Sequence, residues 1–80
     1  MRILGRIPHA VFQIVVYETE RHYYVEIEAG PMKQCFKFPK ESVGGIPGVQ
    51  ALLDADFERG LEARFDQMYS DMKRVLESGK

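Results

Sequence analysis

The fold is decided by residues 11–38, which read VFQIVVYETERHYYVEIEAGPMKQCFKF. Apolar residues alternate with other residues along most of this stretch, and a period of two places every second side chain on one face of a strand. Bends at residues 19–22 and 29–32 divide it, so we expect a three-stranded antiparallel meander. Its shared faces carry Phe12, Ile14 and Val16, then Tyr23, Val25 and Ile27, then Phe36 and Phe38. Residues 2–7 are a candidate for an additional short edge strand.

The opposite faces of these strands are expected to be polar, with Tyr17, Tyr24, Glu26, Glu28, Lys33, Cys35 and Lys37 on them. Pairing across the turn at residues 30–31 would place Glu28 opposite Lys33 and Tyr24 opposite Lys37, which are ordinary cross-strand pairs. Aromatic rings beside lysines on an open sheet also bind single-stranded nucleic acid in several modules. The net charge of -1 argues against that partner. Our alternative hypothesis is nevertheless a nucleic-acid-binding module that uses Tyr17, Tyr24, Lys33 and Lys37, with Arg2 and Arg6 as an arm.

Beyond the glycine- and proline-rich residues 44–48, the apolar period becomes that of a helix. The apolar positions are Val49, Leu53, Phe57, Leu61, Phe65, Met68, Met72, Val75 and Leu76. A step of four residues drifts by about 40° each time, so the two halves of this helix favour different neighbours. Gly60 lies between the halves, and glycine costs about 1 kcal/mol in a helix interior. We therefore predict an α+β fold with a long C-terminal helix that is bent or broken near Gly60.

The predicted helix is too long for the predicted sheet. A helix over residues 47–77 would run about 45 Å, whereas a seven-residue strand spans about 23 Å. We expect the apolar residues of its second half to project past the sheet and to be buried by a second copy of the chain. These residues are Leu61, Phe65, Met68, Met72 and Leu76. The alternative is a tight helical hairpin at Gly60, which would give a compact monomer.

A ladder of acidic residues follows the same helix, with Asp54, Glu58, Glu62 and Asp66 at intervals of four. Like charges at this spacing repel each other by a few tenths of a kcal/mol per pair. A solvated helix face is the simplest interpretation, and a divalent metal site is disfavoured because the helix has no histidine. The interaction hypothesis assigns all four residues to contacts with a basic protein partner or with basic groups of a second copy.

Length and composition describe one small globular domain over residues 1–80, with 45% hydrophobic and 29% charged residues. A single cysteine, Cys35, cannot form an internal disulfide, which favours a reducing compartment and hence the cytoplasm. The sequence contains neither the apolar run of a signal peptide nor the roughly 20 apolar residues of a membrane span. We expect no membrane association.

Residues suited to catalysis are few. His9 and His22 stand in no recognisable relation to Cys35 or to a serine. Lys33 and Lys37 flank Cys35 on one strand face and would favour its thiolate, although a lone strand cysteine is more often a small packing residue. We therefore expect a non-enzymatic interaction or adaptor domain that forms a homodimer and binds neither metal nor cofactor.

Overall fold

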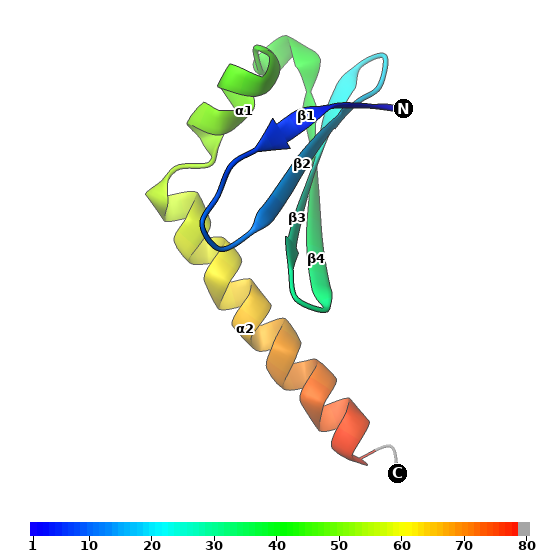
Figure 1. The fold of residues 1–80 in the computed structure, drawn as a ribbon, viewed down its shortest axis with the longest axis vertical. Coiled ribbons are helices and arrows are strands. Elements are labelled where there is room, and N and C mark those ends of the chain that lie inside the picture. The colour runs from blue at the N-terminus through cyan, green and yellow to red at the C-terminus, as the bar shows by residue number, and fades with distance from the viewer. Residues whose placement is uncertain (79–80) are drawn as a thin grey trace.

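The chain forms a four-stranded antiparallel sheet with two helices on one face (Figure 1). A computed structural model describes residues 1–78. The elements are β1 (Arg2–Ile7), β2 (Gln13–Glu18), β3 (His22–Ala29), β4 (Met32–Pro39), a 3-10 turn η1 (Lys40–Ser42), α1 (Gly45–Leu52) and α2 (Ala55–Ser78). Each strand pairs with the next in chain order, so β1 and β4 are the edges of the sheet.

The three predicted strands are confirmed as β2, β3 and β4, and the candidate edge strand over residues 2–7 is confirmed as β1. The predicted count of three strands is therefore corrected to four. A register shift between Ile3 and Gly5 in the pairing of β1 with β2 interrupts the period of two in β1. The predicted pairs across the second hairpin are confirmed, since Glu28 lies opposite Lys33 and Tyr24 opposite Lys37.

The second hairpin turns through two residues, Gly30 and Pro31. Gly30 has a φ of 57°, and a left-handed first position followed by a proline is the arrangement of a type II′ turn. This turn fixes the pairing of β3 with β4 and therefore decides which side chains of β4 face the helices.

The core lies between the sheet and the helices. Its fully buried side chains are Val16, Val25, Ile27, Val49 and Leu61. Each such side chain contributes about 1.5–3 kcal/mol relative to an exposed one. Gly5 admits Ile46 of α1 against β1, because a Cβ at residue 5 would lie 2.7 Å from the Ile46 Cδ1.

The predicted break near Gly60 was wrong. The helical region is interrupted at Leu53 and Asp54, and Gly60 lies inside α2. The Asp54 Oδ1 accepts a hydrogen bond from the Phe57 N–H at 2.9 Å and so caps the new helix. Because α2 is continuous, the alternative of a helical hairpin at Gly60 is also excluded. The Arg64 guanidinium packs over Gly60, 3.1 Å from where a Cβ would stand.

A Gly60→Ala variant is expected to raise the free energy of unfolding by about 0.5–1 kcal/mol, because alanine is the better helix former. Only the flexible end of Arg64 has to move. Gly30→Ala is expected to lower the same quantity by about 1–2 kcal/mol, because residue 30 has a left-handed backbone. Urea denaturation measures both changes. A Gly60→Ala variant less stable than the wild type would show that Arg64 needs the space.

Candidate interaction surfaces

The helix α2 runs past the end of the sheet (Figure 1). Its 24 residues span about 36 Å, whereas an eight-residue strand such as β4 spans about 27 Å. The molecule is accordingly elongated, with extents of 46 × 27 × 19 Å and a radius of gyration of 14.4 Å. A compact chain of this length would have a radius of gyration of about 12 Å.

The residues predicted to form a dimer interface divide into two groups. Leu61 and Phe65 are 1% and 5% exposed, because they lie in this chain's own core. The prediction that they project past the sheet was therefore wrong. Met68 and Met72 are half-buried, and Leu76 is 63% exposed. Met68 still packs against the core, so among the described residues the sheet covers α2 as far as Met68 and leaves its last turns open.

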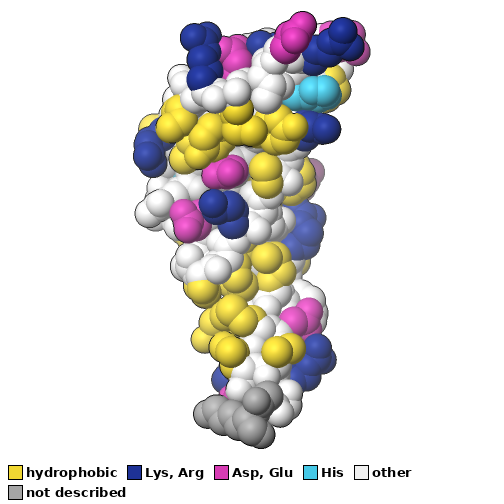
Figure 2. All heavy atoms as spheres, turned by 90° about the vertical axis from the view of Figure 1, so that its right-hand side faces the viewer, with side chains coloured by type: hydrophobic (Ala, Val, Ile, Leu, Met, Phe, Trp, Pro, Cys, Tyr) yellow, Lys and Arg dark blue, Asp and Glu magenta, His cyan; other side chains and the backbone are white. Residues whose placement is uncertain are grey.

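On α2, two exposed apolar residues were missed as interface candidates, Tyr69 at 51% exposure and Val75 at 60%. Val75 belongs to the stripe that packs on the sheet, because the positions 61, 65, 68, 72 and 75 alternate steps of four and three. That spacing produces the seam of a two-helix coiled coil. Figure 2 shows hydrophobic side chains gathered on the narrow lower part of the molecule, where α2 leaves the sheet.

A groove of about 310 Å³ continues this surface between α2 and the end of the sheet. Val11 and Met32 line it from the strand side, and Phe65 and Tyr69 line it from α2. The Val11 side chain is largely exposed. The groove gives the open end of α2 an apolar neighbour that an incoming helix could also touch.

The acidic ladder is not a uniform surface. Asp54 caps α2, and the Glu58 Oε2 lies 3.3 Å from the His9 Nε2. The His9 Nδ1 accepts the N–H groups of Val11 and Phe12, both at 3.1 Å, so the hydrogen of the neutral ring lies on Nε2, the nitrogen next to Glu58. His9 therefore fastens the β1–β2 loop to α2.

Glu62 and Asp66, the other two residues of the ladder, are exposed and edge the groove beside α2. Within residues 1–78, the structure gathers no group of three or more His, Cys, Asp or Glu side chains around a common point. Of the four residues of the acidic ladder, Asp54 and Glu58 thus have contacts within the chain, whereas Glu62 and Asp66 are exposed.

Among the described residues, no helix lies on the outer face of the sheet (Figure 1). Tyr17 lies opposite Tyr24 on the two central strands, and the Lys37 Nζ is 5.9 Å from the centre of the Tyr24 ring. Lys33 is paired with Glu26 at 3.5 Å. Arg2 is not a free arm but part of β1. The nucleic-acid hypothesis stays a prediction.

Cys35 lies on β4 and is exposed. The prediction that its thiolate is favoured was wrong. Partial burial raises the pKa of the thiol, and the nearby Glu26 carboxylate raises this pKa further. The Lys33 ammonium acts in the opposite direction but is outweighed. The raised pKa disfavours the thiolate, which is the nucleophilic form of the group.

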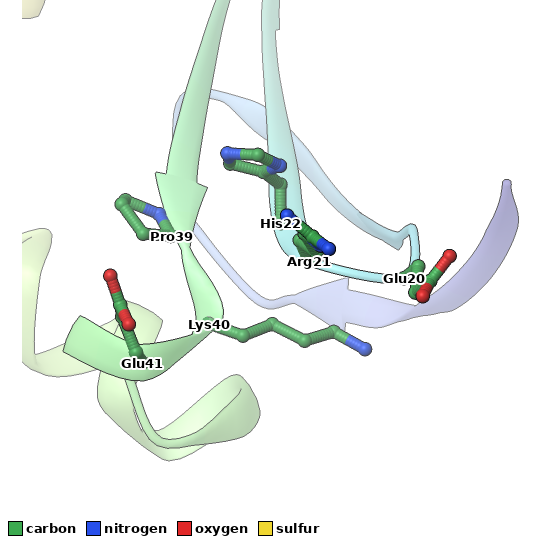
Figure 3. Close-up of a pocket in the computed structure, with 6 residues that line it drawn as sticks. All are labelled: Glu20, Arg21, His22, Pro39, Lys40 and Glu41. Carbon is green, nitrogen blue, oxygen red and sulfur yellow. The ribbon is translucent and has the colours of Figure 1, made fainter.

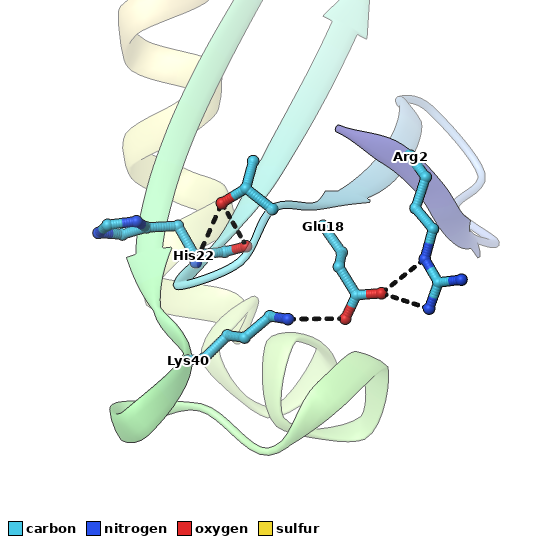
Figure 4. Close-up of polar contacts among 5 residues, drawn as sticks. Arg2, Glu18, His22 and Lys40 are labelled. Atoms are coloured by element: carbon cyan, nitrogen blue, oxygen red, sulfur yellow. Dashed lines mark hydrogen bonds and ion pairs between the residues drawn. The ribbon is translucent and has the colours of Figure 1, made fainter.

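Glu18 joins three segments at the other end of the sheet (Figure 4). Its carboxylate accepts from the Arg2 Nη2 at 2.6 Å and from the Lys40 Nζ at 2.9 Å. These contacts, first with Lys40 and then with Arg2, lower the pKa of Glu18 below its ordinary value of 4.5. A shallow pocket of about 530 Å³ lies next to them, lined by the β2–β3 turn and η1 (Figure 3). Its charges are mixed, and its Lys40 is already engaged by Glu18.

The sequence matches no known family model, and neither a curated protein nor a solved structure resembles the chain significantly. Among residues 1–78, no helix combines the length and the apolar character needed to cross a lipid bilayer.

Glu18 makes the stability of the fold depend on pH. Its pKa is lower in the folded than in the unfolded chain, so the unfolded chain binds more protons and stability rises with pH. The stabilisation is present above pH 4.5 and is lost as the pH falls through the folded pKa. We expect a Glu18→Gln variant to be less stable than the wild type at pH 7 and to approach it at pH 3, measured by urea denaturation. An equal difference at both pH values would contradict this role.

Proposed function

We propose that this chain is a non-enzymatic interaction module that forms a homodimer through the C-terminal half of α2. The observation that carries the proposal is the uncovered apolar surface formed by Tyr69, Val75 and Leu76. Soluble domains seldom leave such a cluster on a projecting helix without a partner. The seam spacing suits a second helix better than a flat surface.

The size of this surface fits a second copy. Tyr69, Val75, Leu76 and Val11 are half to three-quarters exposed, which leaves roughly 400 Å² uncovered on one chain, a size typical of interaction sites. A standard interface buries about 800 Å² per partner, and somewhat more than half of it, about 450 Å², is apolar. The patch thus supplies nearly all the apolar area that a dimer of standard size requires, and the half-buried Met72 adds to it.

Charge favours an antiparallel pair. Glu62, Asp66 and Lys73 form one row along α2, since they are spaced by four and seven residues. In an antiparallel pair this row faces the same row of the partner in the reverse direction. The acidic middle of one helix then lies beside Lys73 of the other, and all three side chains are exposed.

The basic partner assigned to the acidic ladder is therefore, in this proposal, the second copy. Asp54 and Glu58 have contacts within the chain, and only Glu62 and Asp66 remain for it. The lone Cys35 supports a reducing compartment, and we place the dimer in the cytoplasm.

The test is to replace Val75 and Leu76 together with Glu. Both side chains are exposed in a single chain, so the variant should stay folded by circular dichroism while its dimer dissociates. Four apolar side chains leave the interface, so we expect the dissociation constant to rise at least 100-fold, or about 3 kcal/mol. Sedimentation measures it, with Ser70→Glu on the opposite face of α2 as the control. A monomeric wild type at high concentration, or an unchanged variant, would refute the dimer.

The antiparallel orientation has its own test. Lys73→Glu and Asp66→Lys should each raise the dissociation constant about 3- to 30-fold, because each places like charges opposite each other at two symmetric sites. The double variant should recover most of the wild-type affinity, since the pair is restored with its charges exchanged. Additive losses in the double variant would exclude the antiparallel row.

A further inference from the structure

The second open feature is the free edge of β4. Within residues 1–78, β4 has a strand neighbour on one side only, namely β3. It is eight residues long and regularly paired, with no register shift. The opposite edge, β1, carries the irregularity near Gly5, and α1 lies against it. Among the two edges, β4 is therefore the one that can accept another strand.

The backbone groups that such a strand would use follow from the turn. In a two-residue hairpin the residues next to the turn, here Ala29 and Met32, exchange hydrogen bonds, and bonded positions then alternate along the strand. The N–H and C=O groups of Lys33, Cys35 and Lys37 consequently point away from β3. All three residues are exposed.

Side chains on the two faces of this edge differ in chemistry. Lys33 and Lys37 lie on the outer face, where they would flank an added strand. On the inner face, a groove of about 450 Å³ lies between the edge and α2, with Phe36 and Met68 in its lining. Gln34 crosses beside it, since its side chain donates to the Leu61 carbonyl at 3.2 Å and accepts from the Arg64 Nε at 2.8 Å. A new strand would lie about 4.8 Å from β4. Its inward side chains would enter the groove and its outward side chains would meet the two lysines.

We propose that β4 binds an extended segment of another protein by strand addition, and that this segment alternates acidic residues outward with apolar residues inward. The chain's own β3 has this pattern. It pairs with the other edge of β4, and its Glu26 and Glu28 lie beside Lys33. A second copy of β4 is disfavoured, since antiparallel pairing about Cys35 would place Lys33 opposite Lys37 of the partner. The inference does not depend on the dimer.

The probe is a synthetic peptide with the sequence of residues 22–29, HYYVEIEA, blocked at both ends. Binding to the full chain should slow hydrogen exchange at the amides of Lys33, Cys35 and Lys37, because these face the free edge. Amides of Gln34 and Phe36 already face β3 and should not change. Protection elsewhere, or no binding at millimolar peptide, would overturn the proposal.

Two methylated peptides provide a matched comparison. In an added strand, the backbone nitrogens at the positions of Glu26 and Glu28 face β4, because opposed residues of a bonded pair share a face of the sheet. N-methylation there should abolish binding. N-methylation at the positions of Val25 and Ile27 should leave it within about two-fold, because those nitrogens face solvent. Equal effects of the two peptides would exclude strand addition.

The charge requirement is tested with the variant Lys33→Glu, Lys37→Glu. It should bind the peptide about ten-fold more weakly, and it should bind a peptide with Lys at both glutamate positions better than the wild type does. This exchange keeps the test informative even if the variant is less stable. The control Arg6→Glu, Arg59→Glu changes the net charge equally but lies away from the β4 edge, and it should bind normally. An equal loss of peptide affinity in both variants would show that only the net charge matters, and it would overturn the proposal.

Discussion

The apolar stripe of α2 is the constraint on which the rest of the structure depends. Leu61 and Phe65 bury that stripe against the sheet and thereby fix the direction of the whole helix. A helix without a break keeps its face, so the same stripe continues through Met72 to Val75, where the sheet has ended. The interruption at Asp54 comes too early to redirect it. Burial in the first half of α2 therefore causes exposure in the second half.

The sequence predicts the regular parts of the fold and misses those where two effects of similar size compete. The alternation that marks β2, β3 and β4 is strong because one face of each strand is more buried than the other. In β1 a shift of register obscures the alternation. The helix break was placed at Gly60 on propensity, which is worth about 1 kcal/mol. The cap at Asp54 stabilises the start of α2 by a similar free energy, about 1 kcal/mol. Asp56 and Glu58 in the first turn stabilise this helix start further.

The candidate site was harder to predict, because apolar spacing looks the same whether a residue meets its own sheet or another chain. Phe65 and Val75 belong to one stripe, and only the position where the sheet ends assigns the first to the core and the second to the surface. The acidic ladder shows the same difficulty. The contact of Glu58 is His9, which is distant in the sequence. No local pattern distinguishes it from Asp66, which remains exposed.

The two open features of the molecule differ in symmetry, and this difference separates the partners proposed for them. A twofold interface brings each patch against itself, so the patch must contain its own complement. The row on α2 does, because Asp66 and Lys73 carry opposite charges on one flank of an apolar seam. The edge of β4 does not, because Lys33 and Lys37 carry the same charge. In the two proposals, a second copy therefore binds at the helix, whereas like charges would oppose it at the strand. In the strand-addition proposal, the free edge is left for a segment of opposite charge that another protein supplies.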